Sequence, residues 1–136
     1  MTENEVGTIV VQSAVELHRE LGPGLLETVY EAALAYELEM RGLRVERQKA
    51  VPIVYKGRTF DEGFRADLIV AGKVIVELKS VERVIPAYRK QVQTYLRLTD
   101  LRLGYLLNFG AALMKDGITV SVRPTPFLSR RVSASC

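Results

Sequence analysis

Asp67, Glu77 and Lys79 are the residues of this sequence whose types and spacing could do chemistry. They fall in two short apolar runs, 64–70 and 74–79, which are typical of adjacent β-strands joined by a turn that contains Gly72. Side chains alternate between the two faces of a strand. The register of this hairpin therefore decides whether the two carboxylates meet.

Two lengths of the connecting loop give two registers. A two-residue loop at 71–72 would set Asp67 opposite Val76, on the other face from Glu77. A three-residue loop at 71–73 sets Asp67 directly opposite Glu77 and leaves the other face wholly apolar. The pairs on that apolar face would be Val70 with Val74, Leu68 with Val76, and Ala66 with Leu78. We predict the three-residue loop, because burial of an apolar face fixes register strongly and such loops commonly carry a glycine in the left-handed conformation.

In this register the two carboxylates lie about 5 Å apart, with the ammonium of Lys79 one pleat further along. Like charges this close repel, and a divalent cation between them would make the arrangement tolerable. Magnesium is the natural candidate, because it takes a few carboxylates together with water and substrate phosphate. Lys79 would then orient or deprotonate an attacking water. The alternative is an ion pair of Lys79 with either carboxylate on a solvated sheet face, since an E-x-K spacing alone is a common chance match.

The elements that must position these residues follow from apolar periodicity and from turn residues. Two helices come first, followed by three strands, a third helix, a strand and a final hairpin. The expected ranges are 6–21 and 25–41 for the first helices, 45–55, 64–70 and 74–79 for the strands, 88–98 for the third helix, and 103–109 and 118–122 for the last strands. The buried stripe of the second helix is marked by Leu26, Tyr30, Ala33, Leu34 and Leu38. We expect one α/β domain over 1–123 and a poorly ordered tail over 124–136.

Composition narrows the classes of protein. With one histidine and one cysteine, Cys136, the chain has no thiolate or imidazole metal cluster and no internal disulfide, so a metal site must use oxygen ligands. No apolar stretch approaches the length of a membrane span, and the N-terminus lacks the pattern of a signal peptide. We therefore expect a cytoplasmic protein without membrane contact.

Charge is unevenly distributed, although the formal net charge is only +3. Residues 1–82 carry 10 basic and 14 acidic side chains, whereas residues 83–136 carry 9 basic and 2 acidic ones. A cationic segment suits a polyanion, because contacts of lysine and arginine to phosphates displace counterions, but it can equally be a solvated face. Arg89, Lys90 and Arg97 lie on or near the third helix, and we expect part of this charge to bind nucleic acid.

Several separated segments resemble, in the right order, the GxxExxY protein family, a branch of the PD-(D/E)xK superfamily of nucleases. The most specific segment is 24–30, Gly-Leu-Leu-Glu-Thr-Val-Tyr. The others are His18, Leu21-Gly22-Pro23-Gly24, Arg65-Ala66-Asp67, Val76-Glu77-Leu78-Lys79, Gln91 with Tyr95-Leu96, and Leu107-Asn108-Phe109-Gly110. The resemblance implies a restriction-endonuclease-like core, αβββαβ, with a mixed central sheet flanked by helices and a C-terminal hairpin. The proline of the superfamily name is absent, since Arg65-Ala66 precedes Asp67.

The resemblance also implies a metal centre. Asp67, Glu77 and the carbonyl of Leu78 would bind the metal, Glu27 would join them from its helix, and Lys79 would be the catalytic lysine. For Glu27 the simpler explanation is a first-turn glutamate favoured by the helix dipole.

Gln91 and Tyr95 resemble a Q-xxx-Y pair of nuclease domains attached to recombination helicases. Their spacing puts both on one face of the third helix, where they could hold substrate or the lysine. The simpler explanations are a solvated glutamine and a half-buried aromatic. We expect His18 to pack or cap a helix and Asn108 to satisfy a neighbouring loop.

Together these observations predict a magnesium- or manganese-dependent nuclease that hydrolyses phosphodiester bonds, with DNA as the expected substrate. The alternative is a non-catalytic module that keeps the fold and binds nucleic acid or a protein. A chain of 136 residues leaves little beyond its core to build a substrate clamp. A homodimer or a protein partner is for this reason part of the expectation.

Overall fold

The computed structural model of the protein describes residues 1–123, apart from the side chain of Glu62, and the tail expected over 124–136 lies outside the described residues. The helices and strands follow the expected order. They are α1 (Glu3–Leu21), α2 (Glu27–Met40), β1 (Val45–Tyr55), β2 (Arg58–Val70), β3 (Val74–Lys79), α3 (Pro86–Thr99), β4 (Leu103–Asn108), the 3₁₀ turn η1 (Met114–Gly117) and β5 (Ile118–Val122). No helix in residues 1–123 is long and apolar enough to cross a membrane.

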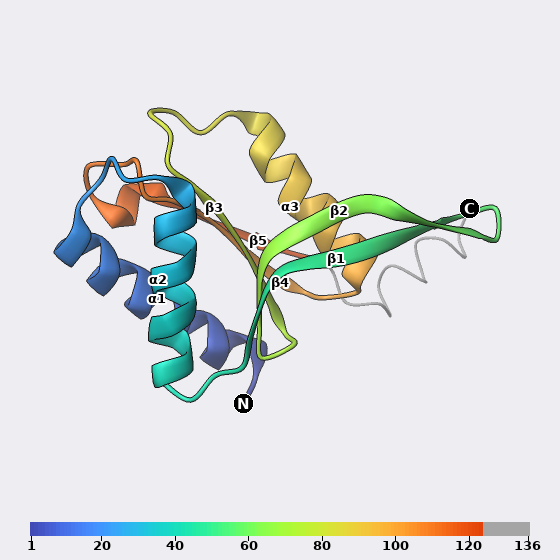
Figure 1. Ribbon diagram of the computed structural model, residues 1–136, viewed down its shortest axis with the longest axis horizontal. Coiled ribbons are helices and arrows are strands. Elements are labelled where there is room, and N and C mark those ends of the chain that lie inside the picture. The colour runs from blue at the N-terminus through green and yellow to red at the C-terminus, as the bar shows by residue number, and fades with distance from the viewer. Residues whose placement is uncertain (124–136) are drawn as a thin grey trace.

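The strands form one five-stranded sheet in the order β1-β2-β3-β4-β5. β3 and β4 are parallel, because α3 connects them, and the other neighbours are antiparallel. α1 and α2 lie on one face of the sheet and α3 on the other (Figure 1). β3 and β4 are buried almost throughout, as expected for strands that helices cover on both faces. The expected mixed sheet flanked by helices is confirmed.

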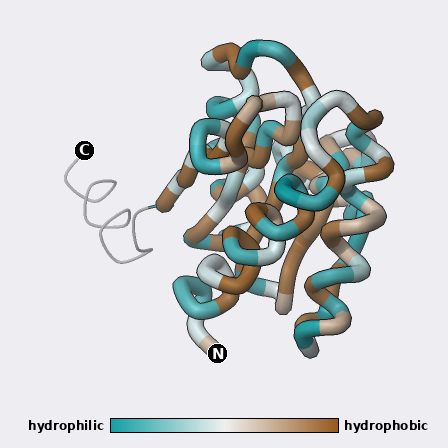
Figure 2. The backbone as a smooth tube through the Cα atoms, turned by 90° about the vertical axis from the view of Figure 1, so that its left-hand side faces the viewer, coloured by the Kyte–Doolittle hydropathy of each residue, from teal (hydrophilic) through white to brown (hydrophobic). Residues whose placement is uncertain are grey.

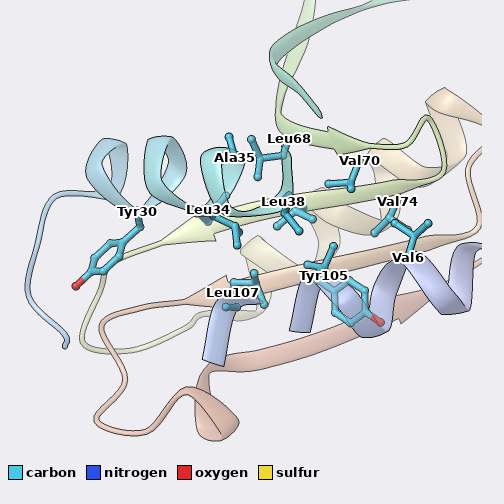
Figure 3. Close-up of a cluster of buried hydrophobic side chains, with 14 of the residues drawn as sticks. Val6, Tyr30, Leu34, Ala35, Leu38, Leu68, Val70, Val74, Tyr105 and Leu107 are labelled. Atoms are coloured by element: carbon cyan, nitrogen blue, oxygen red, sulfur yellow. The ribbon is translucent and has the colours of Figure 1, made fainter. Parts of the chain in front are cut away.

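Each face of the sheet has its own hydrophobic core. The larger core packs α1 and α2 against the sheet and includes Val6, Tyr30, Leu34, Leu38 and Leu107 (Figure 3). The smaller core packs α3 against the other face and contains Ala66, Ile69, Ile75, Val92, Leu96 and Leu106. The hydrophobic strands are enclosed between these helix layers (Figure 2). Any charged group of the central strands therefore lies near a dry interior.

The first two helices begin and end for local reasons. Thr2 and Glu5 form a capping box at the start of α1, and α1 ends at Gly22, whose φ of 71° favours glycine. The expected stripe of α2 is confirmed at Tyr30, Leu34 and Leu38 but is wrong at Leu26, which is 74% exposed. Leu26 precedes the helix with an extended backbone, so its side chain does not continue the helical stripe.

The three-residue loop between β2 and β3 is confirmed. Val70 pairs with Val74 and Leu68 with Val76. The left-handed conformation extends over both Ala71 and Gly72, with φ of 55° and 64°. This register is the one that sets Asp67 and Glu77 at corresponding positions on the two strands.

Ala66 does not lie on the apolar face of β2 on which it was expected. Ala66 packs in the smaller core with Ile69 and Ile75, not in the larger core with Leu68. The alternation of faces is thus interrupted between Ala66 and Leu68. The reason is local, because the ladder between β2 and β3 stops at Leu68 and Val76, and side chains bond to the backbone just beyond it.

β2 begins at Arg58, earlier than the expected start at residue 64. Lys56 and Gly57 turn the chain with positive φ, so that Tyr55 pairs with Arg58 at the tip of a long hairpin. This hairpin, the β1–β2 arm, projects beyond the helices (Figure 1). Pro52 lies in the edge strand β1, at a shift of register between Val51 and Ile53.

Candidate metal centre

The two strands β2 and β3 part at Asp67 and Glu77, and we call this place the carboxylate fork. The backbone N–H of Asp67 donates to Glu77 Oε1 at 3.0 Å, and the backbone N–H of Leu78 donates to Asp67 Oδ2 at 2.9 Å. Each carboxylate thus accepts a hydrogen bond from the opposite strand where the ladder ends. The structure brings Asp67 and Glu77 together, as their register predicts.

Glu77 is held in a setting that disfavours its charge. The residue is only 7% exposed to solvent. Burial, and then the negative charge of Asp67, raise the pKa of Glu77 to about 8, while the N–H of Asp67 and the charge of Lys79 act in the other direction. At pH 7 the fork therefore holds a proton when no cation balances the two carboxylates.

Lys79 ends β3 beside the fork. Its Nζ lies 4.4 Å from the centroid of the Tyr88 ring, a cation–π contact with α3. Among the residues that the structure describes, Lys79 forms no ion pair with Asp67 or Glu77. The alternative of a cross-strand ion pair is therefore wrong in this conformation.

Glu27 is the first residue of α2 and faces the same charges. Partial burial raises the pKa of the Glu27 carboxyl, the positive charge of Lys79 lowers it, and the negative charges of Asp67 and Glu31 raise it. Glu27 also lines a cleft of about 560 Å³ with Leu25, Ser80 and Gly110. The structure thus places this glutamate at the edge of the fork, next to open space.

The loop before Glu27 is fixed by Tyr30. The hydroxyl of Tyr30 donates to the carbonyl of Gly22 and accepts from the N–H of Leu25 at 3.1 Å. Its ring stacks on Phe109 at 4.5 Å between centroids. Gly24 has a φ of 99°, which side chains rarely adopt. The glycine, glutamate and tyrosine of the segment 24–30 therefore work together to place one carboxylate.

Glu31 and Gln48 join the site although the sequence analysis did not single them out. The Nε2 of Gln48 donates to Glu31 Oε1 at 2.6 Å and to Asp67 Oδ1 at 3.2 Å. Arg47 pairs with the other oxygen of Glu31 at 3.2 Å. Glu31 follows Glu27 by four residues, so helical spacing was a usable signal. Gln48 carried none, because its φ of 50° and its place opposite Asp67 appear only in the folded strand.

The residues of α3 divide into buried and exposed ones. Tyr95 is half-buried and stacks on Phe64 at 3.7 Å between ring centroids, with an interplanar angle of 4°. Burial, followed by the charges of Glu77 and Asp67, raises the pKa of Tyr95. Gln91 is exposed, and within residues 1–123 it makes no side-chain hydrogen bond to the fork or to Lys79. Of this expected pair, only Tyr95 lies where the carboxylates influence it.

Three basic side chains project from α3 into solvent. Arg89, Lys90 and Arg97 are exposed, and none of them forms an ion pair with another described residue. They are free to bind an external anion.

His18 and Asn108 have the structural roles expected for them. His18 is buried, and its Nε2 lies 2.8 Å from the carbonyl oxygen of Ala111. Asn108 accepts from the N–H of Val81 and of Gly110 and donates to the carbonyl of Val81, all at 3.0 Å. Asn108 thereby fixes the segment that follows Lys79.

The oxygen ligands at the fork fit a divalent metal. No group of three or more His, Cys, Asp or Glu side chains in residues 1–123 is arranged to hold a metal by itself. Asp67 and Glu77 supply two oxygen ligands, and burial together with the charge of Asp67 raises the pKa of Glu77, which is the situation that a cation relieves. Two carboxylates completed by water and phosphate suit magnesium or manganese, so the residues fit such a metal.

Comparison with known proteins agrees with this chemistry. Residues 4–120, most of the chain, match the sequence model of the PD-(D/E)XK nuclease superfamily. No curated protein matches the chain. No solved structure matches it.

Proposed function

The chain belongs to the PD-(D/E)XK nuclease superfamily, whose restriction-endonuclease-like fold its mixed sheet and flanking helices fit, and on this basis we propose that it hydrolyses phosphodiester bonds of DNA with Mg²⁺ or Mn²⁺. The observation that carries the proposal is the carboxylate fork. The charge of Asp67 raises the pKa of the buried Glu77, and Lys79 and Glu27 lie beside this pair, so the arrangement suits a cation and a phosphate better than it suits the stability of the fold.

In this proposal Asp67, Glu77 and the carbonyl of Leu78 hold the metal, and Glu27 contributes from the edge of the fork. A bound divalent ion would supply stabilisation of the negative charge that develops on the phosphate. Gln48 donates to an oxygen of Asp67 and so orients that carboxylate. The Leu78 carbonyl is assigned by the resemblance, since Leu78 contacts the fork through its N–H.

Lys79 and Tyr95 act on the reacting groups. Water attacks phosphorus, a new P–O bond forms, and the ester P–O bond to the leaving oxygen breaks. The proton that the water loses passes through solvent to the leaving oxygen. The ammonium of Lys79, oriented by the Tyr88 ring, stabilises the charge on the phosphate and aligns the water. Tyr95 and Gln91 would hold the substrate strand, and Arg89, Lys90 and Arg97 would pair with its phosphates.

The finer assignment to the GxxExxY branch is also a proposal. Its support is the joint role of Gly24, Glu27 and Tyr30, in which the tyrosine fixes the loop that presents the glutamate. A homodimer or a protein partner, which would complete a substrate clamp, has no support in the contacts of residues 1–123 and is left to experiment.

One observation favours the alternative of a non-catalytic nucleic-acid-binding module. Lys79 contacts the Tyr88 ring and neither carboxylate, so the conformation described lacks a complete set of catalytic contacts. Hydrogen bonds of catalytic residues often form only with substrate bound, which is why we retain the enzyme as the leading function.

A cleavage assay separates the two functions. Purified protein and its Asp67→Asn variant are incubated with end-labelled linear, nicked, branched and single-stranded DNA, in Mg²⁺, Mn²⁺ or EDTA. We expect cleavage by the wild type that requires the metal and is abolished in the variant. If the wild type binds these DNAs but cleaves none of them, the non-catalytic module is the better account.

A further inference from the structure

The outer part of the β1–β2 arm is a surface that the proposed function does not yet use. Beyond the shift of register, Ile53 pairs with Phe60 and Tyr55 with Arg58. No residue of 53–60 belongs to either hydrophobic core of the described chain. The arm also projects past the helices (Figure 1). Its side chains are therefore available to a partner.

The two faces of this part of the arm differ in chemistry. Directly opposed residues of a hairpin share a face, so Tyr55, Arg58 and Phe60 lie on one face and Val54 and Thr59 on the other. The guanidinium of Arg58 lies 5.3 Å from the ring centroid of Phe60. The ammonium of Lys56, at the turn, lies 5.5 Å from the ring centroid of Tyr55. One face thus combines two exposed rings with two cations.

Tyr55 and Phe60 are exposed to an extent that packing does not explain. Tyr55 is 61% exposed and Phe60 is 37% exposed. Large aromatic side chains left open to water commonly mark a binding surface. Bases of a single strand stack on such rings, because every base presents a π-face.

The charge of the arm suits a polyanion. Residues 47–60 contain Arg47, Lys49, Lys56 and Arg58, and Asp61 and Glu62 are the first acidic residues that follow them. Lys56 and Arg58, at the tip, form no ion pair with another described residue. Cations next to stacking rings are the combination found in grooves that bind single-stranded nucleic acid.

Strand β2 leads from the outer part of the arm toward the carboxylate fork. Phe60 pairs with Ile53 and Phe64 pairs with Val51, on the two sides of the shift of register. Phe64 stacks on Tyr95, whose pKa the two carboxylates influence. At the rise of a β-strand, Phe60 and Asp67 are separated by about 20 Å along β2. A strand bound at the tip would therefore reach the fork through several nucleotides.

We propose that the Tyr55–Phe60 face of the β1–β2 arm binds single-stranded nucleic acid, with bases stacked on Tyr55 and Phe60 and phosphates paired with Lys56 and Arg58. This inference rests on the nuclease function and adds a substrate class to it. A second copy of the chain is a poorer occupant, because Pro52 lies in the middle of the edge strand and lacks the N–H that strand pairing needs.

A fluorescent reporter tests stacking directly. The chain has no tryptophan, so Tyr55→Trp introduces a single one on the aromatic face and Val54→Trp a matched control on the opposite face. Both variants are titrated in EDTA, which prevents cleavage, with a thymidine oligonucleotide, with an abasic strand of the same length and with a duplex. We expect the emission of the Tyr55→Trp variant to be quenched by the thymidine strand and not by the abasic strand. Equal responses of the two variants, or a response to duplex alone, would overturn the proposal.

Affinity gives the second test. In alanine substitutions, the loss of one base stack weakens binding by roughly five- to 150-fold. The double variant Tyr55→Ala/Phe60→Ala should therefore bind the thymidine strand at least tenfold more weakly, whereas Val54→Ala/Thr59→Ala should bind as the wild type does. Phe60→Leu, which keeps apolar bulk without a ring, should fall between them. Thermal melting confirms that each variant is folded.

The outcomes also separate this proposal from the nuclease function. If binding without metal depends on Tyr55 and Phe60 but the wild type cleaves no DNA in the presence of metal, the result supports nucleic-acid binding by the arm and contradicts the nuclease function. Cleavage with unchanged binding by the double variant contradicts the arm alone. A change of sedimentation coefficient in the double variant without DNA would show that the face joins two copies, which would also overturn the proposal.

Discussion

The carboxylate fork and the β1–β2 arm share the strand β2 and differ in almost every physical respect. At the fork, backbone N–H groups and two hydrophobic cores hold the side chains, and Glu77 is nearly inaccessible to water. At the outer part of the arm, the rings of Tyr55 and Phe60 are exposed and lie close to the cations of Lys56 and Arg58. The difference suggests a division of labour, in which a buried backbone fixes the groups for chemistry and an exposed hairpin supplies contacts for binding. Substitutions in the two regions should therefore affect different measurements.

The largest effect is expected from a change at the fork that leaves binding intact. Lys79→Ala should lower the rate of DNA cleavage by about a thousandfold, because it removes the cation that stabilises charge on the phosphate. DNA affinity and metal affinity should change little, since neither the exposed cations nor the carboxylates are altered. Single-turnover cleavage and fluorescence anisotropy, measured on the same preparation, check both parts. A parallel decrease of binding and cleavage would contradict the assignment of chemistry to the fork and of binding to the exposed surface.

The next effect is expected from exposed charge, with the opposite pattern. Removing Arg89, Lys90 and Arg97 should weaken DNA binding by about a hundredfold at 0.1 M salt and reduce the salt slope by about one for each phosphate that the variant no longer neutralises. Successive helical residues turn by about 100°, so some and not all of the three should bind DNA. Metal binding should persist. Arg19→Ala/Lys115→Ala, two exposed cations beside the cleft between α1 and η1, is the matched control. Decreases in proportion to the charges removed, three in the first variant and two in the control, would show that only overall charge matters.

Particular residues show which features of the structure could be predicted from the sequence. The pairing of Val70 with Val74 followed from the apolar pattern, because burial of one face decides register. The face of the sheet on which Ala66 lies could not be predicted in this way. The alternation of faces is interrupted at Asp67, and the interruption depends on hydrogen bonds between side chains and backbone that no local pattern encodes. Gln48 was missed for the same reason. Its contact with Asp67 joins residues 19 apart through a left-handed residue that is not glycine. The length of the arm was underestimated, because Asp61, Glu62 and Gly63 interrupt the apolar pattern by which the continuation of β2 could have been recognised.

The stability of the fork should depend on pH in a way that the arm does not. The folded pKa of Glu77 is raised to about 8 from 4.5, so the folded state binds the extra proton between these values and stability falls as pH rises through them. Glu77→Gln should remove this dependence and increase the free energy of unfolding above pH 8 by about 2–4 kcal/mol in EDTA. Denaturant titrations at pH 5, 7 and 9 measure it. A variant that is less stable than the wild type at pH 9 would contradict the assigned pKa.

The smallest effect is expected from a residue that acts through Asp67. Gln48→Ala removes the amide that bridges Asp67 and Glu31, and should weaken Mn²⁺ binding by about tenfold, as is usual for groups that orient a metal ligand. Gln48→Asn, with a shorter side chain, tests whether the amide must reach Asp67 to have this effect. Thr59→Ala on the arm is the control that should leave Mn²⁺ binding unchanged. If Gln48→Ala increases the affinity, the amide competes with the metal for Asp67 and does not orient it.

The central claim, that Asp67 and Glu77 share a divalent cation, is tested most directly by calorimetric titration of the wild type with Mn²⁺ in two buffers of different ionisation enthalpy. We expect weak binding that releases about one proton at pH 7, because Glu77 is protonated below its pKa of about 8, and almost none at pH 9.5. Asp67→Ala should abolish the binding. Binding that survives in Asp67→Ala, or that releases no proton at pH 7, would contradict the account.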